Sequence, residues 1–123
     1  MNVVDSSGWL SYFAKDKNAS QFAPIIQSTD TLVVPTICLY EVFKRILTQR
    51  GEEAALQAVG IMSLGIIVDL TQEIAINAAQ ISSVGKLTMA DSIILATTQS
   101  NKAMLWTQDV NFEGIEGVKY ISK

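Results

Sequence analysis

Histidine is absent from the 123 residues, and cysteine occurs once, at Cys38. The lack of histidine excludes Ser-His-Asp and Cys-His catalysis, histidine-based acid–base nuclease chemistry and nearly all zinc sites. A single cysteine excludes an internal disulfide and agrees with a reducing compartment. Hydrolytic chemistry in this chain would therefore depend on carboxylates, hydroxyls, lysine or a metal ion held by oxygen.

Long apolar runs and an excess of positive charge are also missing. No run approaches the length of a membrane span, and the first residues lack the basic and then apolar pattern of a signal peptide. We therefore expect a cytoplasmic protein that does not associate with a membrane. The net charge of −3 argues against a generally basic surface for nucleic acid, so RNA or DNA would need a local basic patch or metal ions.

Short apolar runs alternate with longer helical patterns along the chain, which is 49% hydrophobic. The expected strands are Asn2–Val4, Thr31–Val34, Ile66–Leu70, Met104–Thr107 and Val118–Ile121. The expected helices are Trp9–Phe13, Ser20–Gln27, Ile37–Gln49, Glu52–Leu64, Gln72–Val84 and Met89–Ser100. Continuous Val/Ile/Leu runs are typical of parallel strands that are covered on both faces. The sequence predicts one domain over residues 1–123, a three-layer α/β/α sandwich with a central, mainly parallel five-stranded sheet.

Two acids follow directly on expected strands. Asp5 follows "NVV" and Asp109 follows "MLWTQ". In open α/β sheets, ligands bind beyond the carboxyl ends of the strands, where the strand order reverses. Either acid could instead open an ordinary turn, and we interpret Asp69, at the end of another strand, as such a turn residue that lies outside any site.

Asp91 lies near the start of an expected helix, in "TMADSIILAT". That helix is apolar on nearly every side, which indicates burial, and a buried carboxylate is costly unless something pairs with it. Thr88, three residues earlier, could cap the helix and favour an acid at this position. Capping explains an acid near the helix start but not its place among leucines.

Glu41 lies in the helix "TICLYEVFKRILTQR", beside Lys44 and Arg45. The expected apolar face of this helix consists of Leu39, Tyr40, Phe43, Ile46 and Leu47. Pairs of glutamate with lysine or arginine at this spacing are ordinary on solvated helix faces. Periodicity alone favours a solvated Glu41, although the same polar face could overlook a cleft.

Four motifs in order resemble those of PIN domains: "VVDSS", Glu41 after the second strand, "TMADSIILAT" and "LWTQDVNF". The compact length resembles the VapC-type toxins of toxin–antitoxin pairs. The resemblance covers essentially the whole chain and implies an acidic quartet, which would be Asp5, Glu41, Asp91 and Asp109. Thr107 and Ser6 match the small hydroxyl residues beside the last and the first acid. One departure is Ser92-Ile93-Ile94-Leu95, where many relatives have an alanine-rich run.

This resemblance implies a Mg²⁺- or Mn²⁺-dependent ribonuclease, with Asp5, Asp91 and Asp109 as metal ligands. We expect these three carboxylates to converge within reach of a bridging ion, with Glu41 close by. The residues expected to contact RNA phosphates are Lys44, Arg45 and Arg50. The expected partners are an RNA substrate, a cognate antitoxin and a second copy of the chain. The alternative is a catalytically inactive PIN-like or receiver-like α/β binding domain.

Overall fold

Five parallel strands form one sheet in the computed structural model, which describes residues 1–123. The strands are β1 (Asn2–Val4), β2 (Leu32–Pro35), β3 (Ile66–Val68), β4 (Met104–Thr107) and β5 (Val118–Tyr120). They lie in the order β3-β2-β1-β4-β5, and every neighbouring pair is parallel. The predicted five-stranded parallel sheet is therefore confirmed.

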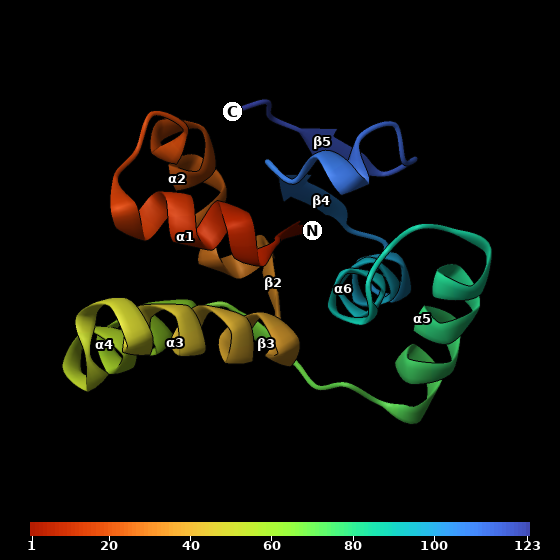
Figure 1. Ribbon diagram of the computed structural model, residues 1–123, viewed down its shortest axis with the longest axis horizontal. Coiled ribbons are helices and arrows are strands. Elements are labelled where there is room, and N and C mark those ends of the chain that lie inside the picture. Colours follow the sequence, from red (N-terminus) through yellow and green to blue (C-terminus); the bar gives the residue numbers. More distant parts are fainter.

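Six helices surround this sheet. They are α1 (Ser6–Ala14), α2 (Ala19–Gln27), α3 (Thr36–Arg50), α4 (Glu52–Met62), α5 (Gln72–Val84) and α6 (Met89–Ser100). Figure 1 shows α1 and α2 on one side of β2, with α5 and α6 on the other, while α3 pairs with α4 below α1. This arrangement confirms the predicted α/β fold. None of the helices combines the length and apolar character needed to span a bilayer.

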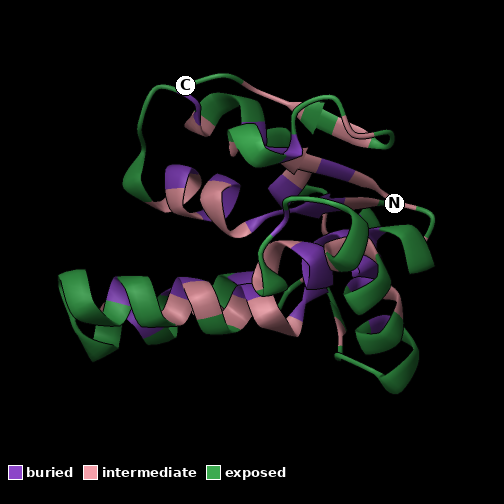
Figure 2. Ribbon diagram, turned by 45° about the vertical axis from the view of Figure 1, so that its right-hand side comes forward, coloured by how far each residue is buried: buried purple, intermediate pink, exposed green.

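The core lies on the central strands, where both faces are covered. Val3, Val4 and Leu105 have no exposed surface, and neither do Val33 and Val34. Burial on both faces is the reason why these strands are continuous apolar runs rather than alternations. Figure 2 shows the buried residues on the strands and on the helix faces that cover them, whereas α5 is mostly exposed.

The strand order reverses beside β1. From β1 the chain builds outward through β2 to β3, and then crosses back to place β4 and β5 on the other side of β1. The carboxyl ends of β1 and β4 therefore flank the position where ligands bind in open α/β sheets. Asp5 and Asp109 follow these two strands, whereas Asp69 follows β3 at the sheet edge.

The buried face of α3 differs from the predicted one. Its buried residues are Cys38, Val42 and Ile46, spaced four apart. Tyr40 and Leu47, which we expected in the apolar face, are 60% and 39% exposed. The pattern of large apolar residues was misleading because the small Cys38 begins the stripe that faces the core. The helix is consequently rotated, so that Tyr40 lies on the rim of a cavity.

Candidate active site

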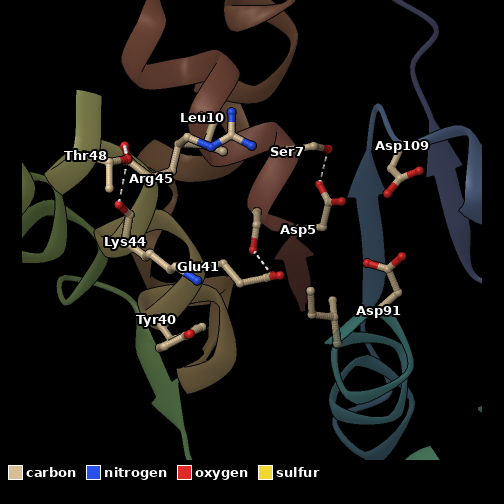
Figure 3. A pocket seen from close by; sticks show the side chains of 12 residues that line it. Asp5, Ser7, Leu10, Tyr40, Glu41, Lys44, Arg45, Thr48, Asp91 and Asp109 are labelled. Atoms are coloured by element: carbon tan, nitrogen blue, oxygen red, sulfur yellow. Dashed lines mark hydrogen bonds between the residues drawn. The ribbon is translucent and has the colours of Figure 1, made fainter. Parts of the chain in front are cut away.

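A cavity of about 460 Å³ opens at the carboxyl end of the sheet. Its walls come from the end of β1, the start of α1, the outer face of α3, the start of α6 and the segment after β4. The lining residues are Asp5, Ser6, Ser7, Leu10, Tyr40, Glu41, Lys44, Arg45, Thr48, Asp91, Ile94 and Asp109. Figure 3 shows Asp5, Asp91 and Asp109 on one side of this cavity, with Glu41 reaching in from α3 on the other.

Asp5 is both the N-cap of α1 and a wall of the cavity. Its Oδ1 accepts hydrogen bonds from the Ser7 hydroxyl (2.7 Å) and the Gly8 amide (3.0 Å), and the residue is 2% exposed. Burial raises the pKa of Asp5 to about 6, with a smaller upward contribution from the charge of Asp109. The hydrogen bonds act in the opposite direction. Asp5 is thus a carboxylate that is costly to ionise where it stands.

Thr107 connects the first acid to the last. Its hydroxyl donates to Asp5 Oδ2 (2.8 Å) and accepts the Asp109 amide (2.9 Å), and the side chain is fully buried. Asp109 in turn accepts the Asn111 amide (2.9 Å) through Oδ1. The ends of β1 and β4 are therefore joined by side-chain hydrogen bonds in addition to the sheet ladder.

Glu41 projects from α3 into the cavity rather than into bulk solvent. Its Oε1 accepts a hydrogen bond from the Ser6 hydroxyl at 2.6 Å, and the residue is half-buried. Because Ser6 opens α1, this bond fixes the glutamate against the helix that begins at Asp5. The polar face of α3 overlooks a cleft, which periodicity alone could not show.

Asp91 has both of the environments that the sequence suggested. The Thr88 hydroxyl accepts the Asp91 amide at 3.3 Å and so caps α6, and every residue from Ser92 to Thr98 is buried. Burial raises the pKa of Asp91, and the negative charges of Asp109 and Glu41 raise it further. Capping and membership of the acidic cluster are therefore compatible at this residue.

The acids surround one cavity but do not form a closed cage. No group of three or more carboxylates is placed so that it could hold one ion, so the closer convergence expected of Asp5, Asp91 and Asp109 is not seen. The donor set nevertheless fits Mg²⁺ or Mn²⁺, because all its atoms are hard oxygens. Mg²⁺ typically uses one or two carboxylates, several waters and substrate phosphates. A site open on one side is what such binding requires.

The predicted basic residues divide between two places. Lys44 and Arg45 line the cavity, whereas Arg50 lies further along α3 and lines a neighbouring groove. Asp69 is exposed and lines neither, as predicted.

Sequence reasoning missed five residues of the cavity wall, which are Ser7, Leu10, Tyr40, Thr48 and Ile94. It assigned no role to Ser7, although a hydroxyl two residues after an N-cap aspartate is well placed to bond it. It also placed Tyr40 in the core, because large apolar side chains lie on two faces of α3 and the sequence does not say which face is buried.

The fold and site together define an α/β protein with a carboxylate site where its strand order reverses. The sequence profile of the PIN domain family matches residues 3–118, and the chain belongs to this family. No curated protein sequence matches the chain significantly.

Solved structures give similar folds over nearly the whole chain. A toxin–antitoxin complex from Klebsiella pneumoniae has a TM-score of 0.80 at 25% identity, covering 98% of this chain and 100% of that one. VapC20 from Mycobacterium tuberculosis, a toxin that cleaves the sarcin–ricin loop, has a TM-score of 0.74 at 14% identity, covering 92% of each chain. DNA-bound VapBC from Salmonella typhimurium has a TM-score of 0.75 at 19% identity, covering 98% of this chain and 96% of that one.

Proposed function

We propose that this chain is a metal-dependent endoribonuclease that hydrolyses phosphodiester bonds of single-stranded or structured RNA. The observation that carries the proposal is the set of four carboxylates around one cavity, at the carboxyl ends of β1 and β4. In a chain without histidine, hydrolysis at such a site would depend on carboxylates, hydroxyls, lysine or a metal ion held by oxygen. The similarity to a toxin that cleaves the sarcin–ricin loop supports RNA as the substrate class.

Each acid has a distinct role in this proposal. One or two of the carboxylates of Asp5, Asp91 and Asp109, together with water and substrate phosphate, would hold each Mg²⁺ or Mn²⁺ ion, which when bound acts as a Lewis acid on phosphate and lowers the pKa of water. Burial, and after it the charge of Asp109, raises the pKa values of Asp5 and Asp91, and a bound cation would offset the cost of ionising them. Glu41, oriented by Ser6, faces the same cavity and would accept a proton from the attacking water.

Two cations on α3 would bring the RNA backbone to these acids. Lys44 and Arg45 line the cavity on the same helix face as Glu41. Their charges offset part of the acidic field and provide donors for phosphate oxygens. Thr107 would keep Asp5 in place through its hydrogen bond and, because its side chain is fully buried, would not contact the substrate.

We further propose that the protein is the toxin of a toxin–antitoxin pair. The similarity to the Klebsiella pneumoniae complex supports an antitoxin partner. An apolar groove of about 420 Å³, whose walls include Tyr12, Phe13 and Ile61, lies between α1, α2 and α4 and offers such a partner a surface. Leu56 on α4 is also 55% exposed. A homodimer, which we predict as well, would cover other exposed apolar residues.

Metal-dependent cleavage of single-stranded RNA tests the catalytic proposal. We expect the purified protein to cut RNA with Mg²⁺ or Mn²⁺ and to be inactive in EDTA. Asp5→Asn, Asp91→Asn and Asp109→Asn should each lower the rate by about 100-fold or more, since each removes a predicted ligand. Asp69→Asn is the matched control, because this exposed acid also follows a strand but lies outside the cavity.

Two results would contradict the proposal. One is the absence of cleavage with either metal by a protein that is folded. The other is cleavage that persists in the Asp5 and Asp91 variants at the rate of Asp69→Asn, which would point to a contaminating nuclease. Either result would favour the inactive, binding-only alternative.

A further inference from the structure

A second groove adjoins the acidic cavity along α3. It has a volume of about 330 Å³ and shares Ser7, Leu10 and Arg45 with the cavity. Beyond the shared residues it continues past Gln49 to Arg50 at the end of α3. The two hollows therefore form one continuous surface, and Arg45 lies at their junction.

The charge of this second groove favours an anion. Its cationic side chains are Arg45, Arg50 and Lys123; the Lys123 carbonyl oxygen accepts a hydrogen bond from Lys17 Nζ (2.6 Å), and the one acidic side chain is Asp16. That carboxylate is already engaged, because Asp16 Oδ1 accepts hydrogen bonds from the Ser11 hydroxyl and from the Asn18 amide (3.0 Å). The groove thus has three cationic side chains and one carboxylate that is hydrogen-bonded to nearby residues of its own loop. It is locally basic, although the net charge of the protein is −3.

An exposed aromatic ring lies at the other end of the same helix. Tyr40 is 60% exposed and lines the acidic cavity. The Lys44 ammonium lies 5.7 Å from the centre of its ring. Proteins that bind single-stranded nucleic acids combine exposed aromatic side chains, on which bases stack, with basic side chains that contact phosphates.

We infer that a single RNA strand lies along α3, with one base stacked on Tyr40 and flanking phosphates bound in the groove of Arg45 and Arg50. Tyr40 and Arg50 are ten residues apart on α3, which is about 15 Å at 1.5 Å per residue. The inference rests on the proposed function, and it adds a binding surface beyond the acids.

Ordinary structural roles explain less of this arrangement. As a structural residue, Arg50 would interact favourably with the negative end of the helix dipole in the last turn of α3. Tyr40 and Lys44, four residues apart, would form only a cation–π contact on the helix surface. Neither role accounts for a groove that leads from the acids to Arg50. Neither role predicts any dependence of RNA binding on RNA length.

Steady-state cleavage of single-stranded RNAs of increasing length tests the inference. Arg50→Gln should raise KM for the longest RNA about five- to tenfold more than for the shortest, and should lower the salt dependence of its binding by about one unit of slope. Tyr40→Leu should raise KM about fivefold or more, and Tyr40→Phe should restore it, because phenylalanine keeps the stacking face. Lys119 is exposed and lines neither the cavity nor the groove, so Lys119→Gln, which also removes one positive charge, should leave KM unchanged.

The outcomes separate this inference from the function on which it rests. Cleavage by all variants with the wild-type KM and salt slope would overturn the RNA path while leaving the nuclease intact. No cleavage by the wild type would overturn both. If Arg50→Gln left RNA cleavage unchanged but weakened binding of an acidic peptide, the groove would be a protein-binding surface and the inference would be wrong.

Discussion

At the scale of the residue, Asp5 shows that a turn and a site can be one feature. The sequence offered two interpretations of this aspartate, a turn former or a member of a site. In the structure Asp5 caps α1 through the Gly8 amide and also lines the acidic cavity. The cap orients the carboxylate, and burial then raises its pKa. The cap therefore fixes the position of the carboxylate, while burial makes its ionised form costly, which a bound metal ion would offset.

The raised pKa of Asp5 predicts how stability depends on pH without metal. The folded protein holds a proton at Asp5 up to about pH 6, whereas the unfolded chain releases it near 3.8. The contribution of the protonated Asp5 to the free energy of unfolding is therefore fully present below pH 3.8 and is lost as the pH rises through 6. Across this pH range, the free energy of unfolding falls by about 3 kcal/mol because of Asp5, at 1.36 kcal/mol per unit of difference between its folded and unfolded pKa values.

Urea unfolding in EDTA at several pH values measures this effect. The free energy of unfolding of the wild type, relative to Asp5→Asn, should fall between pH 4 and pH 7. The asparagine is neutral throughout and supplies the reference, so the titration of other carboxylates cancels. A constant difference across this range would show that Asp5 ionises normally in the folded state.

Asp91 gives a second residue-scale prediction, which concerns metal. Burial and the neighbouring charges of Asp109 and Glu41 disfavour the Asp91 carboxylate in the metal-free protein. Asp91→Asn should therefore raise the melting temperature in EDTA or leave it nearly unchanged. It should also largely abolish the stabilisation by Mg²⁺ or Mn²⁺, which for a single site at about 100 times Kd is roughly 2.7 kcal/mol.

Melting curves with and without metal distinguish this effect from helix capping. The Asp91 amide bonds the Thr88 hydroxyl, and the variant keeps this amide. The Thr88 side chain also lowers the pKa of the Asp91 carboxylate, so that carboxylate contributes to the same helix start. A loss of ~1 kcal/mol or more in EDTA would mean that the carboxylate mainly stabilises the start of α6. Asp69→Asn should respond to metal like the wild type.

At the scale of the element, the close approach of α1 to the sheet places the first acid. A Cβ added to Gly8 would lie 2.6 Å from Val4 Cγ1 and 2.8 Å from the Phe22 ring. Only glycine allows α1 to begin directly over β1 and next to α2. The same residue donates its amide to Asp5, so helix packing and site geometry are coupled.

Gly8→Ala should therefore destabilise the protein, although alanine is the better helix former. The overpacking costs about 1–3 kcal/mol, and the gain in helix propensity offsets up to about 1 kcal/mol of it. We expect a lower free energy of unfolding and weaker metal stabilisation, measured by urea unfolding with and without Mg²⁺. Gly60→Ala is the control, because a Cβ at that helical glycine meets no atom within 4 Å.

The elements also show how far the sequence alone could lead. The bounds of β1, β4, α5 and α6 were predicted correctly, because apolar runs and caps mark their ends. The rotation of α3 was not predictable, since large apolar side chains lie on two of its faces and only packing selects the Cys38 side. For the same reason the sequence could not show that Glu41 faces a cavity. Its bond to Ser6 joins residues 35 positions apart.

At the scale of the whole molecule, the two surfaces of interest are separate. The acidic cavity and its groove follow α3, whereas the apolar groove lies between α1, α2 and α4. The two sets of lining residues share no residue, although α1 contributes to both. Binding of a partner and chemistry on RNA can therefore be tested independently.

Expression in bacterial cells tests the whole proposal. The wild-type protein should arrest growth, because cleavage of cellular RNA is damaging even at low enzyme levels. Asp5→Asn and Asp91→Asn should each relieve the arrest, since each removes a carboxylate from the acidic cavity. Asp69→Asn, with the same change of charge outside the cavity, should remain toxic, and circular dichroism should show that all three variants are folded. Growth arrest that persists in both cavity variants would indicate that toxicity does not depend on nuclease activity. Loss of growth arrest in Asp69→Asn would indicate that net charge or expression level, rather than the acidic cavity, determines toxicity.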